Sequence, residues 1–591
     1  MASSGEAASL LPTINGAAKY KSIILSVCSF ILVTEFCERF AYYGLTGSLP
    51  IFFRKNLGMT SVLATELNSV FSCVTYITPL IGAWVADKFL GRYRSILFFS
   101  IWYFLGLLIC TTASAPPFMS TGWFMIGLFG FISLGVGGIK PNVVVLGADQ
   151  FDTTDPVQKE ERDKFFNWFY WSINIGATFS TAFLTNLAVD GFEPYIPVEY
   201  GFFASFLIPA VAFAIAITIF YSGHKRYVQK PPQGSALSRF MRILVYAGTQ
   251  STKGRLVLSG GLIFAPAIVL TTISYFIEDP QTHLIIAMLG SALVVYGTVV
   301  LIVSGRDTNW VRAAAVENGG EYSMAEALEV AQVVRLSPYF GFLIIFWAVY
   351  SQQTMNFILQ GCQMDLRINN STQISSAMLS MFDSIVILVF VPIFNQFLYP
   401  AIESCGIKLT ILRKMATGFV VAAVCMLIAG ILENYRKTSE MIPGVSSNCA
   451  DSSEFLPMSR ISVWWQTPQY LLVGIAEILI SIPSYDLFYS EVPESMRSVC
   501  QAMNLLTTTL GSVVAGGVNS IFSFWVTSNL NEGHLEYVFY ILAGLVLLNL
   551  ITFVVVSQGF EYHVPAKSKL DLVSGYSPAL PRAARRHSET Q

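Results

Sequence analysis

Apolar runs of about 20 residues recur along this 591-residue chain and constrain its fold more than any other feature. A helix needs about 20 residues to cross roughly 30 Å of hydrocarbon. Hydrophobic residues make up 54% of the chain and charged residues only 12%. This composition indicates a polytopic membrane protein and excludes a disordered chain, a nucleic-acid binder and an ordinary cytosolic enzyme. Fourteen runs qualify, approximately 22–50, 68–87, 95–114, 122–146, 166–188, 201–222, 256–276, 283–304, 339–359, 375–397, 416–433, 463–487, 500–524 and 537–557.

The distribution of lysine and arginine predicts how the chain is oriented. If the N-terminus is cytoplasmic, 27 of the 35 basic residues fall in cytoplasmic segments and 6 on the opposite side. The positive-inside rule therefore predicts that both termini are cytoplasmic. The first run carries charges midway and no cleavage site follows it, so it is not a signal peptide.

The spacing of the runs divides the chain into two bundles of six spans around a cytoplasmic linker. We predict an N-terminal tail, a first bundle, a linker, a second bundle and a C-terminal tail, with bounds 1–21, 22–222, 223–337, 338–560 and 561–591. Two extra apolar runs in the linker, about 256–304, form a hairpin that either spans the membrane or lies on it. An all-α major facilitator fold with two extra linker helices is the expected architecture.

Ionisable residues inside the predicted spans are the first functional candidates, because each costs about 2.5–3.5 kcal/mol to insert at the bilayer centre. They are few: Glu35, Glu38, Arg39, Lys140, Asp383 and Glu477.

Three of these residues lie together in the first span. At 100° per residue, Glu35, Glu38 and Arg39 share one helical face with Tyr42 and Thr46. A structural ion pair that packs this helix is one interpretation. Two acids with one base leave a carboxylate unbalanced, however, and burial or an approaching cation can move such a group between protonation states. The pattern therefore favours a proton carrier.

Lys140 lies in a glycine-rich part of the fourth span, Gly137-Gly138-Ile139-Lys140-Pro141. The spacing does not fit a phosphate-binding loop. Glycines at 127, 130, 135, 137 and 138 instead predict close packing between helices. We expect Lys140 to pair with Glu35 or Glu38, or to meet a substrate carboxylate.

Four stretches resemble motifs of the proton-dependent oligopeptide transporter (POT/PTR) family, in that family's order. The first span contains Glu35-x-x-Glu38-Arg39-Phe40-x-Tyr42-Tyr43-Gly44, similar to the family's ExxERFxYYG motif. The segments 140–151, 165–177 and 464–493 resemble its signatures in the fourth, fifth and tenth core spans. In detail the chain is most similar to the peptide/histidine and plant PTR branches, whereas the extra apolar pair resembles the additional hairpin of bacterial members.

The resemblance implies a secondary transporter, not an enzyme: a symporter of di- and tripeptides that works by alternating access. Glu35 and Glu38 would carry the proton, with Arg39 as counter-ion. The remaining implied roles concern the peptide. Lys140 would bind its carboxylate, and Glu477 would bind its amino group. Asn174 and Tyr42 or Tyr43 would hydrogen-bond its backbone. Tyr350 is expected to line the pocket, and Asp383 would place a titratable group near it. No cofactor is implied apart from the proton, and the carrier is expected to act as a monomer in the lipid bilayer without nucleic acid.

Departures from the family pattern keep two alternatives open. Thr46 occupies a position where many peptide carriers have arginine, and Ser351 one where many have an acid. A carrier of histidine, nitrate or another small solute is therefore one alternative. A nutrient-sensing receptor or scaffold on the same fold is the other.

The segment from Gly82 to Arg94 resembles the facilitator-superfamily loop motif between spans two and three. From this resemblance we expect Asp87 and Arg92 to contribute to a latch at the cytoplasmic face. Positive-inside topology alone would explain the bases of the segment, but not Gly82, Asp87 and Gly91.

Smaller signals concern the loops and tails. Cys362 and Cys449 fall on the predicted non-cytoplasmic side; a disulfide is one alternative, but spacing alone fixes no pairing. No Cys/His cluster indicates a metal site. Asn369 and Asn370 begin overlapping glycosylation sequons on the same side. An acidic dileucine pattern at Glu6, Leu10 and Leu11 suggests a sorting adaptor and a lysosomal or vacuolar membrane, with the plasma membrane as the alternative.

Overall fold

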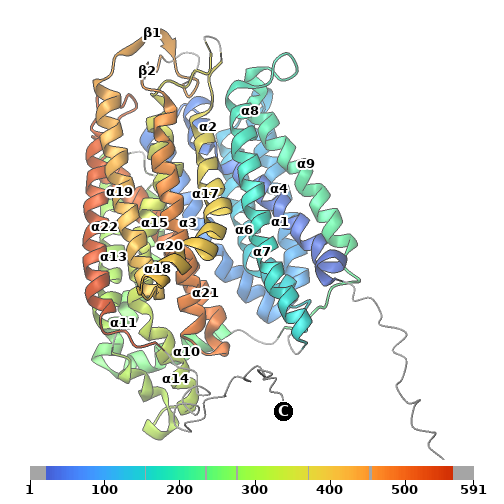
Figure 1. Cartoon of the computed structure of the whole chain (residues 1–591), viewed down its shortest axis with the longest axis vertical. Helices are drawn as coiled ribbons and strands as arrows, with labels where there is room; N and C mark the ends of the chain where they lie inside the picture. The colour runs from blue at the N-terminus through green and yellow to red at the C-terminus, as the bar shows by residue number, and fades with distance from the viewer. Residues whose placement is uncertain are drawn as a thin grey trace, which may run out of the picture.

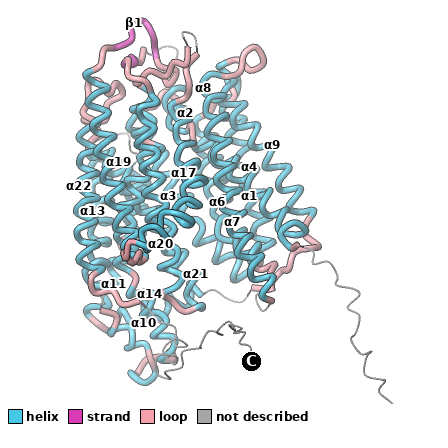
Figure 2. The backbone as a smooth tube through the Cα atoms, in the orientation of Figure 1, coloured by secondary structure: helices cyan, strands magenta, loops and turns pink. Residues whose placement is uncertain are grey.

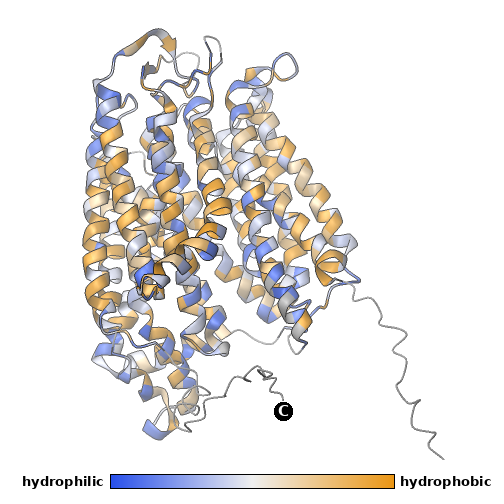
Figure 3. Ribbon diagram, viewed as in Figure 1, coloured by the Kyte–Doolittle hydropathy of each residue, from blue (hydrophilic) through white to orange (hydrophobic). Residues whose placement is uncertain are grey.

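Long helices lying side by side build almost the whole molecule (Figures 1 and 2). The computed structural model describes residues 22–152, 155–232, 236–274, 277, 279–305, 307–369, 372–450 and 455–562. Among these residues, eleven helices are long and apolar enough to cross a membrane by length and composition. The helices at three of the fourteen expected runs, 22–50, 166–188 and 500–524, are not among the eleven. Apolar residues dominate their middles, and polar residues gather toward their ends (Figure 3). The all-α architecture of a polytopic membrane protein is confirmed.

The first six expected spans correspond to the N-terminal half, 22–222. Short π-helical segments lengthen several of its helices, at Ile24–Cys28, Ala86–Leu90, Ile126–Ile132 and Ser180–Leu184. The helices are α1 (Ser29–Thr46), α2 (Leu49–Lys55), α3 (Ser61–Val85), α4 (Arg92–Ser114), α5 (Thr121–Met125), α6 (Ser133–Ala148), α7 (Pro156–Phe179), α8 (Thr185–Asp190) and α9 (Gly201–Ser222).

The linker contains more helix than the two expected runs. Both arms of the extra hairpin, Thr252–Ser274 and Gln281–Ser304, are long and apolar enough to span. The helices are α10 (Ala236–Gln250), α11 (Thr252–Leu262), α12 (Phe264–Ser274), α13 (Pro280–Ser304) and α14 (Met324–Arg335).

The C-terminal half, 338–560, repeats the helical pattern and adds two strands. Strands β1 (Met441–Ser446) and β2 (Pro457–Ser459) pair antiparallel, with Met441 opposite Ser459. The helices are α15 (Ser337–Tyr350), α16 (Asn356–Cys362), α17 (Met381–Ile393), α18 (Tyr399–Ser404), α19 (Ile411–Thr438), α20 (Thr467–Ser490), α21 (Arg497–Ile521) and α22 (Leu535–Ser557).

Side chains that cap the first turns explain where several helices begin. The Thr60 hydroxyl accepts a hydrogen bond from Leu63 N, and the Thr410 hydroxyl accepts one from Arg413 N. Asp155 accepts from Val157 N, and the next residue is a proline at the first helical position. These groups satisfy backbone donors that the helix itself leaves unpaired.

Glycines let α3 approach α6 closely. A Cβ atom added at Gly137 would lie 2.1 Å from Thr78 Oγ1, and one at Gly82 would lie 2.5 Å from Gly137 O. On the side of α6 that meets α4, a Cβ atom added at Gly138 would lie 1.9 Å from the ring of Phe99. The prediction of close packing is wrong for Gly130, because a Cβ there would meet no heavy atom within 4 Å.

The two halves meet along two seams, α3 against α21 and α7 against α17. The extra hairpin packs against the first seam. Its helix α13 contacts α15 and α21, and a small void between α12, α3 and α21 is lined by Thr271, Ser69 and Val513 among others. The division into halves and linker stays a prediction.

The end of the molecule that carries β1 and β2, which we call the strand end, is closed by contacts between the halves (Figure 1). Three hydrogen bonds cross there: Arg54 to Ser528 O (3.0 Å), Ser375 N to Asn186 Oδ1 (2.7 Å) and Asn448 Nδ2 to Asp190 Oδ1 (2.9 Å). The opposite end, with α10 and α14, is called the linker end.

A disulfide joins Cys362 to Cys449 at the strand end, with Cα atoms 5.7 Å apart. It ties the end of α16 to the loop after β1. The structure therefore decides the pairing that spacing left open.

Candidate functional site

The acid–base face of α1 is buried as the helical periodicity predicts. Glu35, Glu38 and Arg39 are each at most 5% exposed. Arg39 Nε lies 3.0 Å from Glu35 Oε1, and Arg39 Nη2 lies 2.5 Å from Glu38 Oε2. One guanidinium therefore holds two carboxylates inside the N-terminal half, so the cluster carries one negative charge more than positive when both acids are ionised.

Lys140 on α6 packs over two tyrosine rings. Its Nζ lies 3.9 Å from the ring centroid of Tyr76 on α3 and 4.8 Å from that of Tyr42 on α1. Lys140 also lies close enough to Glu35 and Glu38 for an electrostatic interaction with both carboxyl groups. The faces of aromatic rings attract a cation without using its N–H donors. The ammonium group is thus stabilised while its donors stay available to a ligand.

An acidic pair lies in the C-terminal half. Tyr350 Oη donates to Asp383 Oδ2 at 3.1 Å, and Gln353 approaches the same oxygen at 3.5 Å. The other oxygen, Asp383 Oδ1, faces Gly474 on α20, and a Cβ atom added at this glycine would lie 2.9 Å from the oxygen. Glu477 follows Gly474 by three residues and so lies on the face of α20 that meets Asp383 of α17.

One oxygen of each acid is buried without a hydrogen-bond donor among the described residues, Asp383 Oδ1 and Glu477 Oε2. A buried carboxylate oxygen is costly unless something donates to it. The pair can therefore accept hydrogen bonds from a ligand, and a protonated amine is the group with the most suitable charge.

Tyrosines connect the basic and acidic sides of the site. Tyr43 and Tyr76 each lie close enough to both Arg39 and Glu477 for an electrostatic interaction with their charges. Tyr42 and Tyr43 contact each other edge to face, with ring centroids 5.3 Å apart. The site is therefore a tyrosine-lined region with Lys140 and the cluster of Arg39, Glu35 and Glu38 on the N-terminal half, and with Asp383 and Glu477 on the C-terminal half.

Asn174 lies on α7, and its side chain is 4% exposed. Its Nδ2 donates to Tyr170 O within the same helix at 2.9 Å. Helix α7 packs against α17, which carries Asp383. Asn174 thus belongs to the helix that forms this seam with α17.

Sequence reasoning did not select Tyr76 or Gln353. Tyr76 carries no charge, and 26 tyrosines in the chain give no reason to choose it. Gln353 lies in a 3₁₀ turn, Ser351–Thr354, that separates α15 from α16. Hydropathy predicts one continuous span there and gives no signal for the turn.

The structure gives Arg92 an ion-pair partner outside the loop motif. Arg92 forms an ion pair with Asp149 at the end of α6, and Lys230 of the linker pairs with the same aspartate at 2.7 Å. Asp87 is an electrostatic neighbour of Arg92. Gln150 completes the attachment of the linker by exchanging two hydrogen bonds with the backbone of Val228.

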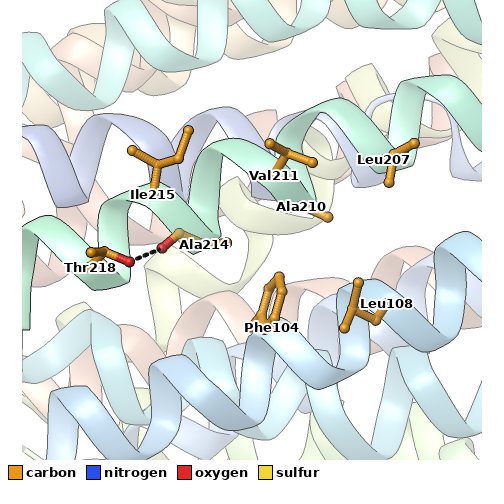
Figure 4. Close-up of a pocket in the computed structure, with 8 residues that line it drawn as sticks. All are labelled: Phe104, Leu108, Leu207, Ala210, Val211, Ala214, Ile215 and Thr218. Atoms are coloured by element: carbon orange, nitrogen blue, oxygen red, sulfur yellow. Dashed lines mark hydrogen bonds between the residues drawn. The ribbon is translucent and has the colours of Figure 1, made fainter.

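The pocket in Figure 4 is not part of this site. It has a volume of about 260 Å³ and lies between α4 and α9. Seven of its eight lining residues are apolar, and the hydroxyl of the eighth, Thr218, donates to Ala214 O. Such a groove suits an acyl chain rather than a charged solute.

Of the remaining predicted sites, one lies among the described residues. Asn369 is exposed near the strand end, and its side chain accepts a hydrogen bond from Thr372 N at 2.8 Å. Asn370, Glu6, Leu10 and Leu11 lie outside the described residues. Within the described ranges, no group of three or more His, Cys, Asp or Glu side chains is arranged to hold a metal ion.

Comparisons with known proteins decide the family. The model of the POT family matches residues 93–534. The chain belongs to the POT family. It is 32% identical to Protein NRT1/PTR FAMILY 8.1 of Arabidopsis thaliana, over 93% of this chain and 96% of that protein. Protein NRT1/PTR FAMILY 8.3 of the same plant is also 32% identical, over 91% of this chain and 92% of that protein.

Solved structures of POT family members share the fold. The in meso crystal structure of the POT family transporter PepTSo superposes with a TM-score of 0.71 and 25% identity, over 90% of this chain and 97% of that one. An auto-inhibited POT family peptide transporter gives a TM-score of 0.72, over 91% and 98% of the two chains, at 23% identity, which supports the fold alone. The resemblance to the POT/PTR family and the major facilitator fold are confirmed, and this POT family member is a membrane transporter.

Proposed function

We propose that this POT family member is a proton-coupled symporter of di- and tripeptides that works by alternating access. The observation that carries the proposal is the placement of Lys140 on one half, and on the other half of the buried oxygens of Asp383 and Glu477 that no described residue donates to. A small peptide is a zwitterion whose charged ends are separated by its backbone. Its two ends match the two sides of this site.

The lysine side is suited to the peptide carboxylate. Lys140 sits on tyrosine faces, so its ammonium can donate to a carboxylate without first breaking a direct ion pair. Asp383 and Glu477 would take the amino group, and Tyr42, Tyr43, Tyr350 and Asn174 would hydrogen-bond the backbone between them. Binding would then draw the halves together around the peptide.

The α1 cluster supports proton coupling. Arg39 shares its charge between Glu35 and Glu38, so a substrate carboxylate that engages Lys140 changes the electrostatic balance around both glutamates. A buried carboxylate that loses a nearby positive charge binds a proton more strongly. In this scheme Glu35 and Glu38 carry the proton and Arg39 is their counter-ion.

Two features support the predicted orientation. Disulfides persist in oxidising compartments and are rare in the cytosol, which favours a non-cytoplasmic strand end. The excess of lysine and arginine on the other side agrees with this assignment. The closed strand end then corresponds to a closed non-cytoplasmic gate, and Arg92, Asp87 and Asp149 belong to the cytoplasmic side.

The alternatives differ from the peptide proposal in the charge of the solute. Nitrate would place an anion beside Asp383 and Glu477, which disfavours it. Histidine is also a zwitterion, and Thr46 in place of arginine is the observation in its favour. A receptor or scaffold without flux has no use for buried charges that cost several kcal/mol each.

A liposome assay tests the proposal. The purified protein is reconstituted with an acidic outside and a neutral inside, and labelled dipeptide uptake is measured with and without a protonophore. We expect accumulation that the protonophore abolishes and that unlabelled dipeptides and tripeptides reduce. Accumulation of histidine or nitrate but not of dipeptide would show that the substrate is that solute. No accumulation of any solute would favour the receptor or scaffold alternative.

A further inference from the structure

A second cluster of buried polar groups lies at the strand end, away from the peptide site. Glu66 on α3 is 2% exposed. His283 Nε2 on α13 lies 3.3 Å from Glu66 Oε1, and Ser520 Oγ on α21 lies 2.5 Å from the same oxygen. One carboxylate of the N-terminal half therefore meets the extra hairpin and the C-terminal half at once.

The hydrogen bonds of His283 determine how many protons the cluster holds. His283 Nδ1 lies 2.9 Å from Ser274 O. A carbonyl oxygen only accepts, so Nδ1 carries a hydrogen. The contact between Nε2 and Glu66 then needs one further proton, either on the imidazole, which becomes a cation, or on the carboxyl group. Without it, the lone pair of Nε2 would face a carboxylate.

The partners of Glu66 belong to the side of the molecule that moves away from it when the strand end opens. Helix α13 packs against α15 and α21, so His283 and Ser520 are both held by the C-terminal half. Next to them, Asn519 Nδ2 donates to Thr65 Oγ1 at 3.3 Å across the same seam. Opening the strand end separates α3 from α21 and so breaks these contacts together.

Other charged groups near the cluster have different partners. On α2, which packs against α3, Arg54 donates to Ser528 O and Lys55 donates to Val189 O. Asp279 begins α13 and accepts hydrogen bonds from Thr282. The carboxylate of Glu66 and the imidazole of His283 are thus the titratable pair that meets on the α3–α21 seam.

We propose that Glu66 and His283 form a one-proton latch that holds the strand end closed, so that protons on that side of the membrane favour closure there. The latch rests on the proposed alternating-access function and adds to it a proton site that is separate from Glu35 and Glu38. Histidine is the side chain that gains its proton between pH 5 and 8. Acid outside therefore closes the carrier, and a neutral interior plays no part in this step.

A distance measurement tests the latch without any peptide. Spin labels are attached to Tyr195→Cys and Phe524→Cys, which are 79% and 64% exposed at the strand ends of the two halves, in a Cys405→Ser background. The ratio of short to long distances is measured in nanodiscs from pH 8 to pH 5. We expect the closed fraction to rise as the pH falls, and one linked proton contributes up to about tenfold per pH unit to the ratio.

Four variants distinguish the latch from other titrating groups. Glu66→Gln and, independently, His283→Gln should each weaken the pH dependence of the ratio of short to long distances. The loss is up to about tenfold per pH unit, the contribution of one linked proton. Ser520→Ala should lower the closed fraction at every pH, by about threefold to tenfold, and keep the slope. Glu199→Gln makes the same chemical change at an exposed strand-end position and should behave as wild type.

The outcomes separate the latch from the proposed function. A wild-type slope in both Glu66→Gln and His283→Gln, or a closed fraction that does not change with pH in the wild type, would overturn the latch. Because the measurement uses no substrate, a pH-dependent latch in a protein that accumulates no peptide would overturn the peptide proposal alone. Peptide accumulation with an unchanged slope in both variants would overturn the latch alone.

Discussion

At the scale of single residues, the site depends on the surroundings of the Lys140 ammonium group. It lies over two tyrosine faces, with centroids at 3.9 and 4.8 Å, and forms no ion pair or hydrogen bond with another residue that the structure describes. A lysine locked to Glu35 would have to lose that partner before it met a ligand, and breaking a buried pair is costly. The observed arrangement avoids that cost.

Replacing Lys140 by alanine should remove the anchor for the peptide carboxylate. Loss of a buried charge-assisted contact costs about 2–5 kcal/mol, which corresponds to a decrease in dipeptide affinity of about 30-fold or more. Gradient-driven uptake into liposomes measures the effect. Lys88→Ala is the matched control, because Lys88 also lies over aromatic rings, at 5.0 Å from Trp84, but is exposed. Unchanged uptake by Lys140→Ala would remove this lysine from the mechanism.

Glu477→Gln should impair free dipeptides more than N-acetylated ones. The variant removes the negative charge that we assign to the peptide amino group, and an acetylated peptide has no such charge to lose. We expect uptake of the free peptide to fall about tenfold or more and the ratio between the two peptides to approach one. Competition by each peptide against a labelled dipeptide gives the ratio. An equal loss for both would assign Glu477 to another role.

At the scale of helices, hydropathy predicts the spans well because it reports which solvent a segment prefers. Both arms of the extra hairpin and the buried face of α1 follow from it and from the helical period. It does not report local hydrogen bonding, so the turn between α15 and α16 was not expected. Pairings between distant segments, such as Arg92 with Asp149 and Glu66 with His283, need the folded chain, because any of several charged residues could have been the partner.

The glycine contact between α3 and α6 leads to a prediction about stability. Gly137→Ala would place a methyl group 2.1 Å from Thr78 Oγ1, so the helices must move apart. Overpacking of this kind costs about 1–3 kcal/mol. Thermal unfolding in detergent should show a lower Tm for Gly137→Ala. Gly130 lies in the same span, with open space where a methyl group would be added, so Gly130→Ala should not lower the Tm. Equal Tm values for both variants would contradict the packing argument.

At the scale of the whole molecule, the halves are joined at the strand end by hydrogen bonds that far separated segments supply. Asn186 and Asp190 of the N-terminal half meet Ser375 and Asn448 of the C-terminal half. Such contacts are individually weak, about 1 kcal/mol each, and can break and form again in every cycle. A small set of them suits a gate better than a large apolar interface would.

Locking these contacts should stop the carrier. The side chains of Asp190 and Asn448 are 2.9 Å apart, so Asp190→Cys with Asn448→Cys can be bridged by a short bis-thiol reagent. We expect the bridged double variant to lose at least about nine-tenths of its uptake, and each single variant treated in the same way to keep it. Uptake by the bridged protein would mean that the strand end does not need to open.

The position of the extra hairpin has a consequence for the surrounding bilayer. Helices α12 and α13 cover the α3–α21 seam with protein, and α13 is attached to the C-terminal half. If the halves rock as proposed, this seam slides against protein of its own chain, whose thickness does not vary with lipid composition. Changes in acyl-chain length should then alter the rocking chiefly through the α7–α17 seam, so the two seams would respond differently to the lipid.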